Sequence, residues 1–398
     1  MRIKIHRGQN QIGGSIIEVS SDSTKIILDA GSELDEKVTV TPLIEGLFSG
    51  KPTYNAAFIS HYHGDHLGLC DKILQEIPVY IGKSAGEVTN AARKFMGKPE
   101  YTFSGYYESE SPFTVGDLVI TPYLCDHSAF DAYMFHVECQ GKTLLYTGDF
   151  RSHGRKSFLP LLDKLSPVDI LITEGTTLSR RPSRMVSEKD LEEKAVQLIS
   201  QTNGPVFVYM AATNIDRLVT AYRAARRTNR IFLQDLYLAA VSTAAGGKIP
   251  KPTAFQDVRV FLTNGNPDSY EQLQLYGDSR IGKQGIAKSR FVMCVRSSMR
   301  GYLEKLAYML CFEDGLLIYS MWEGYKDNEN MKRFLDFMEE RGVRVVLLHT
   351  SGHADSATIE ALICKVQPKA IIPVHTTNAS WFARYPDIRV LKEQDISL

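Results

Sequence analysis

The stretch Ile59-Ser60-His61-Tyr62-His63-Gly64-Asp65-His66-Leu67-Gly68 places three histidines and one aspartate within six residues, directly behind an apolar run. At the end of an extended strand, side chains two residues apart share a face, so His61 and His63 point in the same direction. Asp65 and His66 fall in the turn that opens the next predicted helix. Polar groups packed this densely would cost several kcal/mol of desolvation, which a metal ion with imidazole and carboxylate ligands relieves. The stretch therefore predicts a metal site with room for two ions.

Length and composition narrow the class of protein. The 398 residues exceed the usual size of one hydrophobic core, so we expect two domains, or one domain interrupted by another. The formal net charge is zero, which predicts no global basic field, although a local groove can still be positive. Six scattered cysteines without a CxxC pair, the absence of a signal peptide and the absence of a long apolar run predict a soluble protein of the reducing cytoplasm, with no membrane partner.

The pattern of apolar residues changes along the chain. The first third alternates short strand-like runs with helices that we predict over residues 65–77 and 84–96. After Thr176 a polar, basic connector leads to Ser187, which is a typical helix start. Strands and helices then alternate strictly, and this rhythm predicts a parallel βαβ array.

Four residues cannot complete the coordination shells of two ions, so further ligands must come from elsewhere. His127, Asp149 and His375 each follow an apolar run, and His353 lies in another short polar segment. The carboxyl ends of strands are where α/β proteins bind ligands. Singly, Asp149 is more typical of a turn and His127 of a surface. Together with the opening stretch, they indicate one site.

The order of these motifs resembles the metallo-β-lactamase fold: His61-x-His63-x-Asp65-His66, then a later histidine, a Thr-Gly-Asp and a final histidine. Leu28-Asp29-Ala30-Gly31 matches the first motif of that superfamily. The resemblance implies that Asp29 orients the metal ligands from behind, whereas capping of a strand end is the structural alternative.

Three later motifs resemble those of the β-CASP nucleases, of which ribonuclease J is the bacterial and archaeal type. They are centred on Glu174, His353 and His375. The resemblance implies an α/β protein with a metallo-β-lactamase αββα sandwich and an inserted β-CASP α/β domain. The sandwich would comprise residues 1–180 and 344–398, and the insertion residues 181–343.

The resemblance also implies a set of metal ligands. One divalent ion would be held by His61, His63 and His127, the other by Asp65, His66 and His375, with Asp149 bridging the two. Zinc is the expected ion and manganese the alternative, because both suit mixed nitrogen and oxygen ligands.

The implied chemistry is hydrolysis of a phosphodiester by a hydroxide that the two ions share. Asp65 belongs to the catalytic group as well as to the ligands. His353 would protonate the leaving oxygen and Glu174 would position His353. Substrate contacts are implied at Ser351, Gly352, Ala354 and Ser356.

A terminal histidine at the position of His375 goes with RNA-acting relatives, so RNA is the expected substrate. Asp355 departs from ribonuclease J, which has a serine there that helps to bind a 5′-phosphate, so endonucleolytic and 5′-exonucleolytic cleavage both stay open. Because the chain stops soon after His375, the extra C-terminal domain of typical ribonuclease J is expected to be absent, and a homodimer would have to form without it.

Other functions compete with this interpretation. A small-molecule metallohydrolase of the thioesterase or lactonase kind shares the histidine motif, as does a DNA nuclease of the same superfamily. An inactive binding protein would be expected to have lost ligands. Arg223, Arg226 or Arg227, and Arg230 recur at helical spacing, which indicates a solvated helix face, with a phosphate track as the alternative.

Overall fold

The computed structural model describes residues 1–34, 40–180, 185–263, 265 and 267–397. The chain divides into two compact units. The first contains Met1–Asn90, Pro99–Arg184 and Gly352–Leu398, and the second contains Ala91–Lys98 and Met185–Ser351. That the second unit is an inserted β-CASP domain over residues 181–343 stays a prediction.

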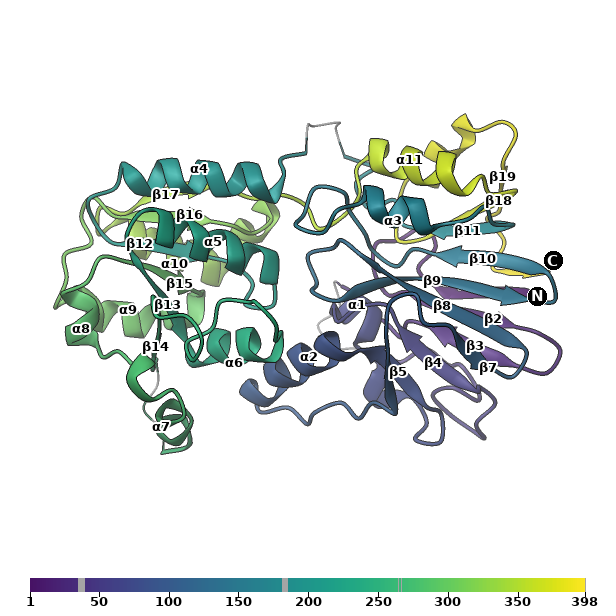
Figure 1. Ribbon diagram of the computed structural model, residues 1–398, viewed down its shortest axis with the longest axis horizontal. Coiled ribbons are helices and arrows are strands. Elements are labelled where there is room, and N and C mark those ends of the chain that lie inside the picture. Colours follow the sequence, from purple (N-terminus) through teal and green to yellow (C-terminus); the bar gives the residue numbers. More distant parts are fainter. Residues whose placement is uncertain (35–39, 181–184, 264, 266, 398) are drawn as a thin grey trace. The chain divides into compact units, whose positions relative to one another are not determined.

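The first unit is built on two seven-stranded sheets (Figure 1). The first sheet has the order β20 (Asp395–Ser397), β1 (Arg2–Arg7), β2 (Ile16–Ser20), β3 (Lys25–Leu28), β4 (Ala56–Ile59), β5 (Val79–Gly82) and β6 (Gly105–Tyr107). The second has the order β19 (Arg389–Val390), β18 (Ala370–Pro373), β11 (Ile170–Thr173), β10 (Lys142–Tyr146), β9 (Ala132–Cys139), β8 (Leu118–Cys125) and β7 (Phe113–Val115).

The two sheets pack face to face, because one buried apolar cluster takes residues from both. Ile3, Val19 and Phe58 of the first sheet share this cluster with Phe135 and Leu144 of the second. On the outer face of the second sheet lie α3 (Leu159–Lys164) and α11 (Ser356–Val366), whose apolar residues form another buried cluster with that sheet (Figure 1). Helix α2 (Lys83–Phe95) forms where a helix was predicted over 84–96.

The strand register brings several carboxyl ends to the same edge. In the second sheet β10, β11 and β18 are parallel neighbours, with Tyr146 opposite Ile172 and Thr173 opposite Pro373. Their carboxyl ends therefore lie side by side, and the loops that follow them start from adjacent positions. In the first sheet β3 and β4 are parallel in the same way. These two edges supply the residues of the candidate site.

The predicted helix over residues 65–77 is wrong in extent. Helix α1 covers only Gly64–Leu67, followed by a short 3₁₀ turn at Cys70–Lys72. The backbone amide of Leu69 donates to Ala30, and that of Leu74 donates to Leu47. Hydrogen bonds to other segments thus replace the next helical turns, which the apolar spacing alone could not reveal.

The second unit is a parallel sheet with helices on both faces (Figure 1), as the alternating pattern predicted. The strand order is β14 (Val258–Phe261), β13 (Ile231–Asp235), β15 (Phe291–Val295), β12 (Val206–Tyr209), β16 (Leu316–Tyr319) and β17 (Arg344–Leu347). One face packs against α4 (Glu188–Ser200), α5 (Ile215–Arg227) and α6 (Leu236–Ala244), and the other against α8 (Lys283–Ala287), α9 (Arg300–Ala307) and α10 (Glu329–Glu339). The remaining helix of this unit is α7 (Pro267–Gln274).

Strand β17 pairs with β16, so residues 344–347 complete this parallel sheet, although we expected residue 344 to begin the last part of the first domain. Ser187 starts α4 as predicted, with a capping box in which its side chain accepts from Asp190.

The arginines predicted to recur at helical spacing do not all lie on the helix. Helix α5 ends at Arg227, and the side chain of Arg230 is buried instead of lying on the helix face. Its guanidinium donates to the backbone carbonyls of Thr202, Gly204 and Phe291. Arg230 therefore has a structural role and cannot extend a phosphate track.

Candidate metal centre

The opening motif occupies the turn from β4 into α1. His61 and His63 follow the last residues of the strand, and Asp65 and His66 are in the first turn of the helix. The turn is held in place because the backbone amide of Ser15 donates to Asp65 and that of Ala30 donates to His66. The four side chains therefore project from a short segment that is anchored at both ends.

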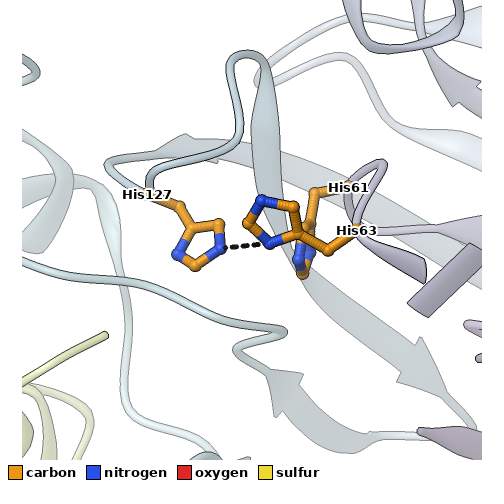
Figure 2. A group of neighbouring side chains, drawn as sticks. All are labelled: His61, His63 and His127. Atoms are coloured by element: carbon orange, nitrogen blue, oxygen red, sulfur yellow. Dashed lines mark hydrogen bonds between the residues drawn. The ribbon is translucent and has the colours of Figure 1, made fainter. Parts of the chain in front are cut away.

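Three imidazoles form the first cluster (Figure 2). The ligand atoms of His61, His63 and His127 all lie within 4.8 Å of one another, and His127 Nε2 is 3.0 Å from His63 Nδ1. His127 reaches this point from the loop after β8. Burial lowers the pKa of His63 to about 4 and holds the pKa values of His61 and His127 well below their usual range. The rings are thus neutral and can offer lone pairs to a metal ion.

The second cluster is Asp65, His66, Asp149 and His375, again with ligand atoms within 4.8 Å of one another. His375 Nε2 lies 2.9 Å from Asp65 Oδ2, and His66 Nε2 lies 3.3 Å from Asp149 Oδ2. Asp149 follows β10 and His375 follows β18, so the parallel register of the second sheet brings them together.

Asp149 lies between the two clusters. Its Oδ2 atom is 3.3 Å from a nitrogen of His66, 3.8 Å from one of His375 and 3.9 Å from one of His61. Burial would raise the pKa of Asp149, but the neighbouring histidines hold it well below its usual range. The carboxylate is therefore ionised where both clusters can share it.

Buried polar atoms that lack hydrogen bonds indicate whether these residues suit metal ions. Among the described residues, no well-aligned hydrogen bond reaches His61 Nε2, His66 Nε2 or either carboxylate oxygen of Asp149, although all four atoms are buried. The 3.3 Å contact between His66 Nε2 and Asp149 Oδ2 is an ion pair. Each of the four atoms costs about 1–3 kcal/mol if it stays unsatisfied. Divalent ions coordinated by nitrogen and oxygen would satisfy all four, so the side chains fit two divalent ions.

Hydrogen bonds on the side away from the clusters fix the orientation of the candidate ligands. Asp29, fully buried, accepts from His66 Nδ1 at 2.7 Å, from Ser60 Oγ at 2.8 Å and from the Tyr146 hydroxyl at 2.6 Å. The Ser60 hydroxyl in turn lies 3.0 Å from His61 Nδ1. Asp29 thereby turns Nε2 of both histidines toward the site, and its role in orienting metal ligands stays a prediction.

Two more ligands are oriented in the same way. The backbone carbonyl of Gly352 accepts from His127 Nδ1 at 2.5 Å, and the Thr176 hydroxyl lies 2.8 Å from His375 Nδ1. In both rings, Nε2 is the nitrogen left to face the clusters.

His353 and Glu174 form a pair beside Asp149. His353 Nδ1 is 3.1 Å from Glu174 Oε2 and 3.5 Å from Asp149 Oδ2. Burial disfavours charge on this ring, yet the carboxylates of Glu174 and Asp149 raise the pKa of His353 to about 9. Its side chain is 22% exposed, whereas that of Glu174 is fully buried. His353 can therefore meet a bound molecule, and Glu174 can only act through it.

The predicted substrate contacts have different surroundings. Ala354 is buried, and its backbone carbonyl accepts from the Thr177 hydroxyl. Ser356 is exposed in the first turn of α11, and Ser351 is the last residue of the second unit. The backbone carbonyl of Gly352 accepts a hydrogen bond from His127. The role of these four residues in binding substrate stays a prediction.

Asp355 has a structural explanation. Its carboxylate caps α11 by accepting from the backbone amide and the hydroxyl of Thr358, at 2.8 and 2.6 Å. Aspartate is among the preferred residues at this position of a helix. The departure from the ribonuclease J motif thus coincides with a helix cap.

Sequence reasoning missed several residues that support the site, among them Ser60, Tyr146 and Thr176. All three lie within or next to the motifs named from the sequence, and this position was the one signal that could have identified them. The buried ion pair of Asp126 and Arg151, with Nε and Oδ2 3.1 Å apart, also went unnoticed. Asp126 accepts from the backbone amide of Gly154 as well, so this pair fixes the loop after Asp149.

Known proteins with similar sequences agree with the expected fold. The family model of the metallo-beta-lactamase superfamily matches residues 11–195. Ribonuclease J from Helicobacter pylori is 21% identical over 392 residues, which cover 92% of this chain and 55% of that protein. An RNase J-like protein from Methanocaldococcus jannaschii is 26% identical over 243 residues, or 55% of this chain and 54% of that protein. This chain thus spans about half the length of these relatives.

One solved structure covers all of the chain. The crystal structure of a protein of unknown function from Enterococcus faecalis V583 superposes with a TM-score of 0.81 at 21% identity, covering 100% of this chain and 99% of that one. The superposition supports the fold alone. The predicted metallo-β-lactamase fold with an inserted domain and the predicted likeness to ribonuclease J are confirmed. No helix in the described part of the chain is long and apolar enough to cross a membrane.

Proposed function

We propose, from the match of residues 11–195 to the metallo-beta-lactamase superfamily, that this protein is a two-metal phosphodiesterase that hydrolyses RNA. One observation carries the proposal: seven side chains converge around four buried polar atoms for which the described residues provide no hydrogen bond. The likeness to ribonuclease J over most of the chain supports RNA as the substrate, and so does a histidine at position 375.

The first ion would be held by His61, His63 and His127 and the second by Asp65, His66 and His375, with Asp149 shared. When bound, the ions supply Lewis acidity toward the phosphate and lower the pKa of a water molecule to about 7. Zinc is the ion that we favour for this donor set, with manganese as the alternative.

The protein's own residues orient the ligands and move a proton. Asp29 holds His66 directly and His61 through Ser60. Glu174 holds His353 through Nδ1, so Nε2 is the nitrogen that would give a proton to the leaving oxygen. His353 would then recover its proton from solvent, because its side chain is partly exposed.

The proposal is tested with metal-loaded protein and end-labelled RNA carrying either a 5′-monophosphate or a 5′-hydroxyl, beside matching single-stranded DNA. We expect cleavage of RNA that is lost in His63→Ala and kept in His136→Ala, which removes a histidine of β9 outside the clusters. No cleavage of RNA by protein with full metal content would overturn the proposal.

The same assay decides the mode of cleavage. Equal internal cutting of both RNAs indicates an endonuclease, whereas a preference for the 5′-monophosphate indicates a 5′-exonuclease. Hydrolysis of a thioester or lactone without cleavage of RNA would favour the small-molecule alternative, and cleavage of DNA alone would favour the DNA nuclease.

A further inference from the structure

A basic hollow lies in the second unit, on the side of the sheet covered by α4 and α5. It has a volume of about 650 Å³ and is lined by four cationic side chains: Arg223, Arg226, Arg227 and Lys248. The three arginines project from the last two turns of α5, and all four cations are exposed. Residues three and four apart on a helix are neighbours, so the arginines form one ridge along the hollow.

Acidic residues neutralise only part of this charge. Glu192 of α4 lies 3.5 Å from Arg223 and 3.4 Å from Arg227, and Glu193 pairs with Arg227 at 2.7 Å. For Arg226 and Lys248, the described part of the chain offers no carboxylate within ion-pair distance. Asp257 adds a third carboxylate, which accepts from the Tyr222 hydroxyl at 3.0 Å. Four cations thus face three carboxylates, which leaves the hollow positive although the whole chain is neutral.

The floor of the hollow is aromatic. Phe255 is half-buried and packs edge-on against Tyr222, with ring centroids 5.4 Å apart. A partly accessible ring beside cationic side chains is the combination that binds single-stranded nucleic acid, because a base stacks on the ring while arginines meet the phosphates. An acidic peptide would use the charges but not the ring.

We infer that the hollow lined by Arg223, Arg226, Arg227, Lys248 and Phe255 binds the backbone of a single RNA strand, at a site distinct from the metal centre. The inference rests on the proposed RNA substrate. The site would hold part of the RNA through sequence-independent phosphate contacts, whereas the metal ligands and His353 all belong to the first unit. Ion pairs with Glu192 keep Arg223 and Arg227 in place for this contact.

The experiment measures binding of the full-length protein to a fluorescent single-stranded RNA of about 12 nucleotides, with a chelator present so that no cleavage occurs. The test variant is Arg226→Gln/Lys248→Gln, which breaks no ion pair. The matched control is Lys288→Gln/Lys332→Gln, which removes two exposed charges of the same unit outside the hollow.

We expect the test variant to bind RNA about tenfold more weakly, and its plot of log affinity against log salt to be shallower by about 1.4, since each contact with a single strand contributes about 0.7. The control should bind as the unmodified protein does. Phe255→Leu should weaken binding of RNA about fivefold or more without changing binding of polyglutamate of equal charge.

Equal affinities for the unmodified protein and the test variant would overturn the inference. Equal binding of polyglutamate and RNA would overturn the choice of RNA in favour of an acidic protein. Because binding is measured without cleavage, the outcome is separable from the proposed function. If the protein cleaves RNA and the test variant binds RNA normally, only the inference of a second site is wrong. If the protein binds RNA through the hollow but does not cleave it, only the proposed activity is wrong.

Discussion

Each unit contains a buried polar network, and the two networks differ in how their polar atoms are satisfied. In the second unit Glu188 accepts from Arg217 Nη2 at 3.0 Å and from the Thr220 hydroxyl at 2.9 Å, and Arg217 also donates to the backbone carbonyls of Ser320 and Leu348. In the first unit the carboxylate oxygens of Asp149 lie among histidine nitrogens, and none of the residues described by the structure gives them a hydrogen bond.

The difference separates a structural network from a binding site. The Glu188 network joins α4, α5 and the ends of β16 and β17, and it is complete without any ligand. The Asp149 network can be completed only by something that accepts lone pairs from nitrogen and oxygen together. A buried charge without a well-aligned hydrogen bond is therefore the feature that distinguishes the candidate metal centre from an ordinary buried ion pair.

Asp149→Asn should have the largest effect. The shared carboxylate is lost while its shape is kept, so we expect RNA cleavage to fall by about 10⁴-fold. In metal-free protein we expect the free energy of unfolding to fall by less than about 3 kcal/mol, because only the attraction between the carboxylate and the nearby histidines is lost. The effect on activity is measured as the rate of RNA cleavage at saturating metal. The effect on stability is measured by urea unfolding of metal-free protein. Asp163→Asn, on the exposed side of α3, should change neither. A loss of about 3–5 kcal/mol in metal-free Asp149→Asn, as for a complete buried ion pair, would mean that its carboxylate is satisfied by the fold.

Glu188→Gln should have the opposite profile. It leaves the buried guanidinium of Arg217 without its counter-charge, so we expect a loss of about 3–5 kcal/mol in the free energy of unfolding. Urea unfolding measures it. Glu329→Gln removes an exposed pair with Arg333 on α10 and should cost less than about 0.5 kcal/mol. If both variants lowered the free energy of unfolding by the same amount, the buried pair would be no more important for stability than the exposed pair, contrary to our expectation.

His353→Gln should lower the rate of RNA cleavage by about 100-fold or more, because it removes a proton donor, while the metal content stays unchanged. Elemental analysis measures the metal content, and single-turnover kinetics measure the rate of cleavage. Loss of metal together with activity would instead make His353 a ligand, which its distance of 3.5 Å from Asp149 Oδ2 would also permit.

Asp29→Asn should have the smallest effect on this scale. Asparagine keeps the positive φ of 62° at low cost but weakens the hydrogen bond that orients His66, so metal affinity should fall about 10- to 100-fold. Competition with a coloured chelator measures the affinity. An unchanged affinity would limit Asp29 to the capping role that is its structural alternative.

The sequence contains enough to predict which side chains cluster at the candidate site and the order of the elements. His61, His63, Asp65 and His66 are recognisable because they are close along the chain, and Asp149 and His375 because each follows an apolar run. The parallel array after Ser187 is equally visible, since helical and strand periods alternate there.

Other features depend on contacts between distant segments. Helix α1 stops after Leu67 because the amides that follow bond to Ala30 and Leu47, which no local pattern encodes. Arg230 continues the arginine spacing, yet it is buried because α5 ends three residues earlier. The Tyr146 hydroxyl that supports Asp29 comes from the opposite sheet, so only the packed structure identifies it.

The central claim is that the unsatisfied atoms around Asp149 bind two divalent ions. The direct measurement is the metal stoichiometry of full-length protein that is stripped with a chelator, reloaded with zinc or manganese and passed through a desalting column. We predict two ions per chain for the unmodified protein and for His136→Ala, and at most one for His63→Ala. No bound metal in the unmodified protein, or two ions in His63→Ala, would contradict the claim.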